Sequence, residues 1–574
     1  MYSFDELKKL SKKEAGAFKK IKIAILADSS TQFLALAIKG YGVANSIQYD
    51  VWEADINQID RQVFDPTSEL YQFAPDYVLI LISTEHLLGS FYKKTIEHKE
   101  HFAKEHISYL ESLIQQISEK LSSKIITNSY GEINDRVFGN YSAKVRSSFI
   151  YQIRKLNAGM LDWLQTHNNL FLLDVSSLVT QIGYDAAFNP MLYVNADVVY
   201  SFDLLPYIAS NLHSIIQSLN GYLKKCLILD LDNTMWGGVI GDDGMEGIKI
   251  GNLGIGKAFS EFQLWIKQLK NRGIILAVCS KNTEAIAKEP FEKHPDMELR
   301  LDDIALFVAN WENKVDNIRY IQNILQIGFD SMVFLDDNPF EREIVKNGIP
   351  ELCVPDLPED PALYLTYLKE LNLFETVSFT EEDTIRTKQY QEEANRAVIK
   401  RSFANENEFL NSLSMQSEVL HFNAFSIPRV VQLIQRSNQF NLRTQRYAEA
   451  DVVKMTESSD YITLSFTLED KFGNHGLIGA VILKRIDKQT LFIDTWIMSC
   501  RVLKRGMEQF TLYCLLKEAD KRGYSKLVGE YIPTAKNGIV KEHYSSLGFE
   551  PMDGKWVLNI DKEKQKNNSH IKIK

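Results

Sequence analysis

Residues 226–234 read CLILDLDNT, an apolar run that ends in two aspartates and a threonine. Two later segments have the same form, since IILAVCS ends at Ser280 and SMVFLDD ends at Asp337. Short apolar runs that are followed by polar residues and then by helix-like sequence are typical of the parallel strands of an α/β domain. We therefore expect the three polar ends to meet at one edge of a parallel sheet, where such folds bind ligands.

The polar residues at these strand ends suit phosphoryl transfer. Asp230 and Asp232 lie two residues apart, so that one carboxylate attacks an electrophile while the other handles the proton. Asp336 and Asp337 add oxygen ligands of the kind that Mg²⁺ prefers when it binds substrate phosphate. Lys314 lies between the second and third strand runs, where its ammonium group neutralises phosphoryl oxygens. The alternative is that these aspartates only cap the strand ends.

The motifs DLDNT (230–234), VCSKN (278–282), the lone lysine and FLDDNPFER (334–342) resemble, in this order, those of the haloacid dehalogenase (HAD) superfamily. The resemblance implies that Asp230 is a nucleophile that becomes an aspartyl phosphate and that Asp232 is the general acid/base. It also implies a set of residues for the phosphoryl group, namely Thr234, Ser280 and Lys314. The implied Mg²⁺ ligands are Asp230, the backbone carbonyl of Asp232, Asp336 and Asp337.

The spacing of the motifs predicts an open site. About 50 residues separate Asp230 from Ser280 and about 34 separate Ser280 from Lys314, too few for a large cap domain. Between them, residues 236–251 contain six glycines and are typical of a flexible hairpin flap. An open site needs a partner or a neighbouring domain to exclude water.

A strand-to-helix turn further along, CRVLKRG, resembles the R/Q-x-x-G-x-G/A loop of the GNAT acyltransferases, with Arg501 first and Gly506 last. Lys504 stands where that family has its first glycine. Asn537 and Tyr544 fit the family's later motif, in which the tyrosine protonates the leaving thiolate. The resemblance implies a site for coenzyme A or for a phosphopantetheine arm. The alternative is a GNAT fold used for packing or for holding the arm without acyl transfer.

The first strand run of the chain ends in ADSS (27–30), which resembles the GDS block of SGNH hydrolases. Ser29 would be the nucleophile and Asn128 an oxyanion donor. That family carries Asp-x-x-His near the end of the domain, whereas here Asp203 is followed by Pro206 at the position of the histidine. Because a serine nucleophile needs a base, we expect a degenerate, non-hydrolytic domain.

The order of phosphatase motifs, connecting helix, NQFNLRT (438–444), DKFGNHG (470–476) and CRVLKRG turn resembles the FkbH-like family over essentially the whole chain. Members resemble glyceryl transferase/phosphatases that take 1,3-bisphosphoglycerate and load the glyceryl group onto an acyl carrier protein. The resemblance implies a Mg²⁺-dependent phosphatase that acts on a phosphorylated small molecule and is coupled to acyl transfer onto that carrier. A thioester route would need a thiol, for which Cys279 is the candidate, although strand alternation places it on the face opposite Ser280.

Two other functions stay open at this point. One is a phosphatase of a sugar or small metabolite, fused to an acyltransferase that acts in surface polysaccharide synthesis. The other is a scaffold without catalysis.

The composition of the chain excludes several classes of protein. With 75 acidic and 65 basic residues the formal net charge is −10, which argues against nucleic-acid binding. The longest apolar runs have strand length, and the N-terminus lacks the apolar core of a signal peptide, so we expect no membrane segment. The five cysteines form no CxxC pair, which favours reduced thiols and a cytoplasmic location.

The chain of 574 residues is longer than one hydrophobic core usually fills, so we expect an α/β protein of several domains. The predicted parts are a helical lead (1–20), an SGNH-like α/β domain (21–220), a HAD-type Rossmann-like α/β domain without a large cap (221–360), a connecting helical segment (361–410), a GNAT-like α+β domain (411–560) and a disordered tail (561–574).

Overall fold

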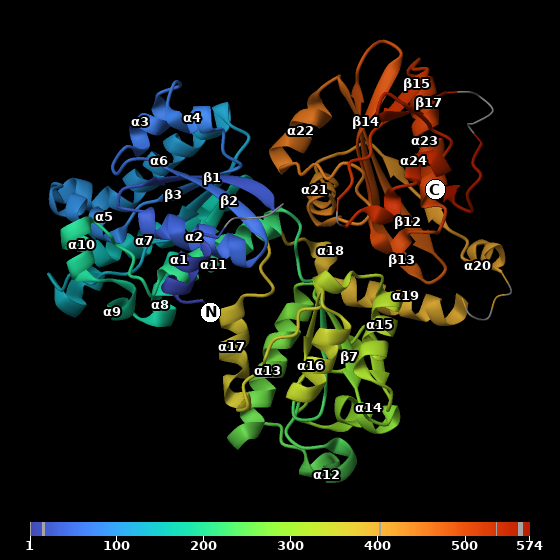
Figure 1. The fold of residues 1–574 in the computed structure, drawn as a ribbon, viewed down its shortest axis with the longest axis horizontal. Coiled ribbons are helices and arrows are strands. Elements are labelled where there is room, and N and C mark those ends of the chain that lie inside the picture. The colour runs from blue at the N-terminus through green and yellow to red at the C-terminus, as the bar shows by residue number, and fades with distance from the viewer. Residues whose placement is uncertain (1, 14–17, 401–402, 404, 535, 561–565) are drawn as a thin grey trace. The chain divides into compact units, whose positions relative to one another are not determined.

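The computed structural model describes residues 2–574 except 14–17, 401–402, 404, 535 and 561–565. The chain forms two compact units, Met1–Ile216 and Gln217–Lys574. Figure 1 shows the elements of both. Among the described residues, no helix combines the length and the apolar character that crossing a membrane requires.

Unit 1 is built on a five-stranded parallel sheet of order β2-β1-β3-β4-β5. Its strands are β1 (Lys19–Ala27), β2 (Ile47–Glu53), β3 (Tyr77–Leu81), β4 (Lys124–Asn128) and β5 (Leu170–Leu173). Its helices are α1 (Phe4–Leu10), α2 (Gln32–Ala44), α3 (Ile59–Phe64), α4 (Glu69–Phe73), α5 (Thr84–Tyr92), α6 (Ile96–Lys120), α7 (Phe149–Leu164), α8 (Val175–Ile182), α9 (Tyr184–Ala187), α10 (Pro190–Ala196) and α11 (Leu205–Leu219).

Unit 2 begins with a four-stranded parallel sheet of order β8-β7-β6-β9. Side chains alternate between two apolar cores, with Leu227 and Leu229 on one face of the sheet and Cys226 and Ile228 on the other. The strands are β6 (Cys226–Leu229), β7 (Ile275–Ser280), β8 (Leu306–Ala309) and β9 (Met332–Leu335). The helices are α12 (Ile240–Gly247), α13 (Gly254–Asn271), α14 (Glu284–Lys293), α15 (Lys314–Leu325), α16 (Pro339–Gly348) and α17 (Tyr364–Leu371). The predicted parallel sheet is confirmed.

The rest of unit 2 has the predicted α+β arrangement, with a mixed sheet of order β16-β17-β15-β14-β13-β12-β10-β18. Its strands are β10 (Gln416–Ser417), β11 (Val419–Leu420), β12 (Tyr461–Asp470), β13 (Gly473–Arg485), β14 (Thr490–Met498), β15 (Lys526–Gly529), β16 (Glu550–Met552), β17 (Lys555–Asn559) and β18 (Lys572–Ile573). The helices are α18 (Glu381–Thr384), α19 (Arg386–Lys400), α20 (Glu406–Ser412), α21 (Ile427–Arg436), α22 (Glu449–Glu457), α23 (Met507–Lys521) and α24 (His543–Ser546).

Three details differ from the sequence-based expectation. Tyr364, Leu368 and Phe374 pack into the core of the HAD-type domain, so the proline-rich break near residue 360 does not end that domain. The glycine-rich segment 236–251 is anchored rather than free, because Trp236 is buried at 0% exposure and α12 forms within it. In the tail, of which residues 566–574 are described, β18 pairs with β10 and Ile571 is 1% exposed, so this part is not a loose end.

Helix α19 does more than connect two domains. Its N-terminal neighbour α18 is capped by its own first turn, in which the Thr380 N–H donates to Asp383 Oδ2 at 2.9 Å. Along α19, Tyr390 and Ala394 pack into the core of the HAD-type domain, while the Arg396 guanidinium reaches Asp470 at the end of β12. The helix therefore contacts both parts of unit 2.

Candidate active site

The carboxyl ends of β6 and β9 bring three aspartates together. The strands pair in register at Leu229 and Leu335, which sets Asp230 beside Asp336. Oxygen atoms of Asp230, Asp336 and Asp337 all lie within 4.8 Å of one another. Asp336 is fully buried and Asp230 nearly so. The expectation that these strand ends share one site is met by this geometry.

Lys314 supplies the positive charge of the site. It is the first residue of α15, whose N-cap Asn313 accepts a hydrogen bond from the Asp316 N–H. The Lys314 Nζ lies 3.0 Å from Asp230 Oδ2 and 2.5 Å from Asp336 Oδ2. Burial alone lowers the pKa of this lysine, but the two carboxylates outweigh it and raise the pKa above its usual value.

The carboxylates remain in excess over this single cation. Burial, and then the negative charge of Asp230, raise the pKa of Asp336 and of Asp337. The carboxylates therefore repel one another in their ionised forms, and a bound cation would reduce this repulsion. Hard oxygen donors in this number suit Mg²⁺.

The Asp232 side chain is held by residues that the sequence analysis did not single out. Its Oδ1 accepts hydrogen bonds from Trp236 Nε1 and from the Ile240 N–H, both at 3.0 Å, and its Oδ2 accepts one from Asn282 Nδ2 at 3.2 Å. Burial, and then Asp230, raise the pKa of Asp232. A carboxyl group that is fixed and shifted in this way suits proton transfer. Asn282 lies within the VCSKN motif, which was the available signal.

Thr234 and Arg342 join the strand ends to each other. The Thr234 hydroxyl accepts a hydrogen bond from the Asp337 N–H at 3.1 Å and donates to Asp337 Oδ1 at 3.2 Å. The Arg342 guanidinium donates to the carbonyls of Asp336 and Asp337 at 2.8 and 2.6 Å. Ser280 ends β7 at the same edge of the sheet and is 2% exposed. Of the residues predicted to bind phosphate, Thr234 and Lys314 thus contact the aspartates, and Ser280 ends the neighbouring strand.

Cys279 does not take part in this arrangement. Its side chain is 0% exposed and packs with Ile275 and Ala277 in the core on the opposite face of the sheet from Val278. Burial raises the pKa of its thiol well above the usual value. A buried, protonated thiol is not a nucleophile, so the predicted thioester at Cys279 is not supported.

The residues predicted to bind coenzyme A or a phosphopantetheine arm fall into two places. Arg501 bonds Gln389 and lies 5.7 Å from the ring of Tyr390, so it turns toward α19. Gly506 instead lines a separate cavity of about 520 Å³, and its turn lies under the C-terminal segment near Ser569. The arginine and the glycine of the predicted loop therefore do not share a cavity.

The contacts of Asn537 and Tyr544 are with the backbone and core of the domain itself. The Asn537 amide donates to the carbonyls of Asn441 and Ile532 at 3.0 and 2.9 Å. Tyr544 is 1% exposed and packs against Gly529 at the end of β15.

The NQFNLRT string fills the space between β14 and the segment after β15. The Met498 N–H donates to the Phe440 carbonyl at 3.3 Å, and the Ile532 N–H donates to the Leu442 carbonyl at 2.9 Å. This string therefore has a packing role that its amide-rich composition did not reveal.

In unit 1, the strand order reverses between β1 and β3, and parallel sheets typically bind ligands in the crevice at the carboxyl ends of such strands. Ser29 follows β1 and is 5% exposed, and Asp203 is exposed. The Asn128 amide is already engaged, since it accepts from the Ile82 N–H and donates to the Ile82 carbonyl. The predicted oxyanion donor is thus not free.

The sequence analysis missed a histidine in this crevice. His86 Nε2 lies 2.7 Å from Asp197 Oδ1, and its Nδ1 lies 3.8 Å from Asp28 Oδ2. Burial is the main cause that raises the pKa of Asp28. Both ring nitrogens therefore have a carboxylate neighbour, and the SGNH resemblance stays a prediction.

Comparison with known proteins gives the following similarities. A family model described as FkbH, N-terminal domain, matches residues 22–217. The crystal structure of the N-terminal part of the protein BF1531 from Bacteroides fragilis, containing a phosphatase domain complexed with Mg, is 50% identical with a TM-score of 0.63, and the match covers 66% of this chain and 100% of that chain. None of the curated proteins compared with the chain matches it.

Two acetyltransferase structures are similar to the C-terminal part. The ribosomal-protein-S18-alanine N-acetyltransferase of Escherichia coli is 18% identical over 25% of this chain and 95% of that chain, with a TM-score of 0.21. The Escherichia coli GNAT protein YhbS in complex with CoA is 17% identical over 28% of this chain and 88% of that chain, with a TM-score of 0.19. Scores this low carry no argument about ligands.

Proposed function

Because the chain belongs to the FkbH-like family, we propose that it is a Mg²⁺-dependent phosphatase whose nucleophile is Asp230. The observation that carries this proposal is the set formed by the buried Asp230 and Asp336 and the half-buried Asp337 at the carboxyl ends of β6 and β9, together with the buried Lys314 of α15. The substrate is a phosphorylated small molecule.

The residues fit Mg²⁺. Three carboxylates with mutually close oxygens face one ammonium group, and burial, followed by the negative charge of Asp230, raises the pKa of Asp336 and of Asp337. Asp230, Asp336 and Asp337 would hold the ion, together with the backbone carbonyl of Asp232. When bound, Mg²⁺ neutralises phosphoryl oxygens and orients the phosphate.

The first half of the reaction uses the two aspartates of the DLDNT motif. The Asp230 carboxylate attacks phosphorus, the bond from phosphorus to the leaving oxygen breaks, and Asp232 gives its proton to that oxygen. Trp236, Ile240 and Asn282 hold the Asp232 carboxyl group in one orientation for this transfer. Lys314 balances the charge on Asp230 and on the phosphoryl oxygens.

In the second half, the ionised Asp232 takes a proton from a water molecule. The resulting hydroxide attacks phosphorus, the bond between phosphorus and the Asp230 oxygen breaks, and inorganic phosphate leaves. The raised pKa of Asp232 supports both roles, since it brings the proton affinity of the carboxyl group closer to neutral pH.

We extend the proposal to acyl transfer from an acyl phosphate onto the thiol of an acyl carrier protein. The sulfur attacks the carbonyl carbon, the bond from that carbon to the phosphate oxygen breaks, and inorganic phosphate leaves as the thioester forms. The cavity of about 520 Å³ beside the Gly506 turn supports this step, because it adjoins a strand-to-helix turn suited to a phosphopantetheine arm. Cys279 has no part in it. The competing function, a sugar or metabolite phosphatase in surface polysaccharide synthesis, shares the same phosphatase site.

The test compares Asp230→Asn with Asp242→Asn, an exposed aspartate on α12. Release of inorganic phosphate from a generic phosphate ester is measured with Mg²⁺ and with EDTA. We expect loss of turnover for Asp230→Asn, retention for Asp242→Asn, and loss in EDTA for every form. Undiminished turnover by Asp230→Asn would refute the phosphatase assignment.

Loading of a holo carrier protein, measured by mass spectrometry with 1,3-bisphosphoglycerate as donor, tests the acyl transfer. Phosphate release without loading would favour the polysaccharide function.

A further inference from the structure

Unit 2 contains a cavity of about 470 Å³ that is separate from the phosphatase residues. Its lining includes Lys225, which precedes β6, and Ile275, which begins β7. It also includes Ser331 before β9, Arg386 on α19, and Arg501 in the turn after β14. The cavity therefore lies at the amino ends of the same parallel strands that carry the aspartates at their carboxyl ends.

The lining of this cavity is strongly cationic. Six basic side chains line it, namely Lys225, Arg386, Arg429, Arg436, Arg501 and Lys536. Four of the six have carboxylate partners. Asp383 pairs with both Arg386 and Arg436, Glu382 pairs with Arg429, and Asp330 pairs with Lys536.

Lys225 and Arg501 have no carboxylate within 4.0 Å among the residues that the structure describes. The Lys225 ammonium donates to the Arg436 carbonyl at 2.8 Å. The Arg501 guanidinium donates to Gln389 Oε1 and, at 3.4 Å, to the Ser499 hydroxyl, and it is only 7% exposed. All of these partners are neutral, so neither of these two cations has a carboxylate partner.

The basic groups also repel one another. Burial, with the charges of Arg386 and Arg436, lowers the pKa of Lys225 to about 8. Burial, and then Arg386, lower the pKa of Arg436 to about 9. Buried cations without counter-charges lower the stability of the folded protein, and a bound anion would offset this cost. The six basic side chains are balanced by four carboxylates, namely Asp383, Glu382, Asp330 and Glu351, which also lines the cavity, so an excess of two positive charges suits a ligand with two negative charges.

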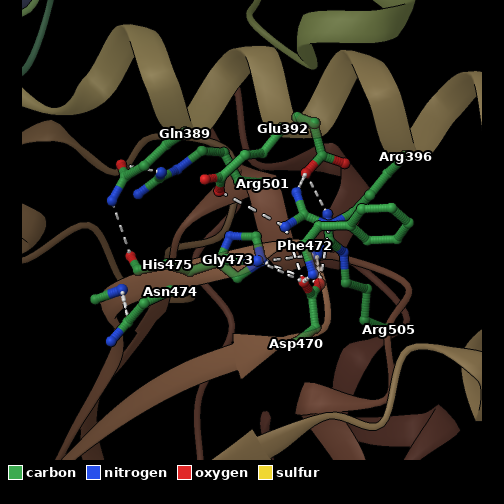
Figure 2. Close-up of polar contacts among 12 residues, drawn as sticks. Gln389, Glu392, Arg396, Asp470, Phe472, Gly473, Asn474, His475, Arg501 and Arg505 are labelled. Atoms are coloured by element: carbon green, nitrogen blue, oxygen red, sulfur yellow. Dashed lines mark hydrogen bonds and ion pairs between the residues drawn. The ribbon is translucent and has the colours of Figure 1, made fainter.

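Arg501 is held in position for such a ligand. Figure 2 shows its partner Gln389 on α19, the helix from which Glu392 and Arg396 extend toward the turn at residues 470–475. The side chain of Asp470 is 0% exposed, and its carboxylate accepts two hydrogen bonds from Arg396, at 2.8 and 2.9 Å. These bonds hold α19, and with it Gln389 and Arg501, in place. Binding of an anion therefore costs little side-chain entropy.

We propose that this cavity binds a phosphate monoester, as a second phosphate site distinct from that of Asp230. A phosphate monoester carries close to two negative charges at neutral pH and has three acceptor oxygens for guanidinium and ammonium donors. The volume admits more than the phosphate group itself. The ester comes either from a free phosphorylated metabolite or from the 3′-phosphate of coenzyme A, and the probes below separate these sources.

The experiment is isothermal titration calorimetry on the full chain in EDTA, with inorganic phosphate, glycerol 3-phosphate, coenzyme A and 3′-dephospho-coenzyme A as probes. We expect Lys225→Gln and Arg501→Gln each to weaken binding by about tenfold or more, the usual effect of one lost charged hydrogen bond. Arg501→Lys keeps the charge and should keep part of the affinity. The control variant Lys388→Gln removes an exposed charge from α19, the helix that carries Arg386, and should bind each probe as tightly as the unaltered chain does.

Two further measurements separate binding from folding and from the phosphatase site. The melting temperature of Lys225→Gln in phosphate-free buffer should not fall, since a cation without a carboxylate partner is removed, whereas its rise on adding phosphate should shrink. Lys314→Gln should leave binding in EDTA unchanged.

The proposal fails if no probe binds in EDTA, or if Lys225→Gln and Arg501→Gln bind as tightly as Lys388→Gln. It also fails if Lys314→Gln alone abolishes binding. Tighter binding of coenzyme A than of its 3′-dephospho form would identify the carrier-type phosphate as the ligand, and preference for glycerol 3-phosphate would identify the metabolite.

Discussion

Replacement of Asp470 by asparagine should detach α19 from the C-terminal part of unit 2. The side chain of Asp470 is 0% exposed, and its carboxylate accepts hydrogen bonds from Arg396, from the N–H groups of Phe472 and Gly473 at 2.9 and 3.2 Å, and from His475 Nε2 at 3.3 Å. Figure 2 shows these contacts converging on it. The asparagine keeps the shape but removes the carboxylate that accepts two hydrogen bonds from Arg396, whose remaining close carboxylate is Glu393 at 3.0 Å.

Loss of one partner of a buried ion pair typically costs about 3–5 kcal/mol. Since each step of about 1.4 kcal/mol is a factor of ten, amide hydrogens of α19 should exchange about 10²- to 10⁴-fold faster in Asp470→Asn. Hydrogen exchange followed by mass spectrometry of peptides from α19 measures this change locally. Because several domains are present, a local readout is preferable to a single unfolding midpoint.

The pH dependence of this effect has a definite sign. The hydrogen bonds from His475 and Arg396 outweigh burial and hold the pKa of Asp470 well below its usual value. A depressed pKa means that the stabilisation is complete above the unfolded-state value of about 3.9 and is lost as the pH falls toward the folded-state value. The difference between Asp470→Asn and the unaltered chain should therefore be full at pH 7 and shrink below pH 4.

Two controls sharpen the result. Glu284→Gln breaks an exposed pair with Lys288 on α14 and should change exchange by no more than about fivefold, because such pairs contribute about 1 kcal/mol or less. In the double variant Arg396→Met/Asp470→Asn the loss should be smaller than the sum of the two single losses, because the variants remove the same pair. Unchanged exchange of α19 in Asp470→Asn would refute the reasoning.

Three other predictions concern the chemistry. Asp232→Asn should slow hydrolysis of the aspartyl phosphate, so that an adduct accumulates in intact-protein mass spectra; a variant with full turnover and no adduct would exclude the role. Mg²⁺ affinity, measured by calorimetry, should fall between pH 8 and pH 5, because the raised pKa of Asp336 lets protons compete with the ion, and a constant affinity would contradict this. Ser29→Ala should leave hydrolysis of a model ester unchanged, because both ring nitrogens of His86 have carboxylate neighbours, Asp197 and Asp28, instead of the Ser29 hydroxyl; a Ser29-dependent rate would overturn this.

The sequence allowed the positions of the strand-end residues to be predicted, because short strands and fixed motif order determine where Asp230, Ser280 and Asp336 lie, whereas their roles in catalysis stay predictions. The alternation along β7 also predicted correctly that Cys279 faces away from the site. The contacts of His86 with Asp197, 111 residues apart, had no such signal. Pairings of this kind depend on how distant elements pack, and local periodicity carries no information about them.

The domain boundary near residue 360 shows a related limit. Prolines break regular structure, and the segment VPDLPEDP contains three of them. A break in secondary structure is not the end of a core, however, since Tyr364, Leu368 and Phe374 return to pack on the same sheet. The burial of these side chains depends on tertiary packing, which the local breaker signal does not report.

The short strands of the HAD-type sheet place the proposed anion cavity and the aspartate site at opposite ends of the same strand. Lys225 immediately precedes β6 and Asp230 immediately follows it, so a strand of four residues, roughly 13 Å long, separates the cavity from the nucleophile. An anion in the cavity would compensate Lys225 and Arg501 together, and therefore favour the packing of the turn after β14 against the base of this sheet. Occupancy of the cavity would thus strengthen the joint between the two parts of unit 2 and leave the crevice at Asp230 open to its own substrate.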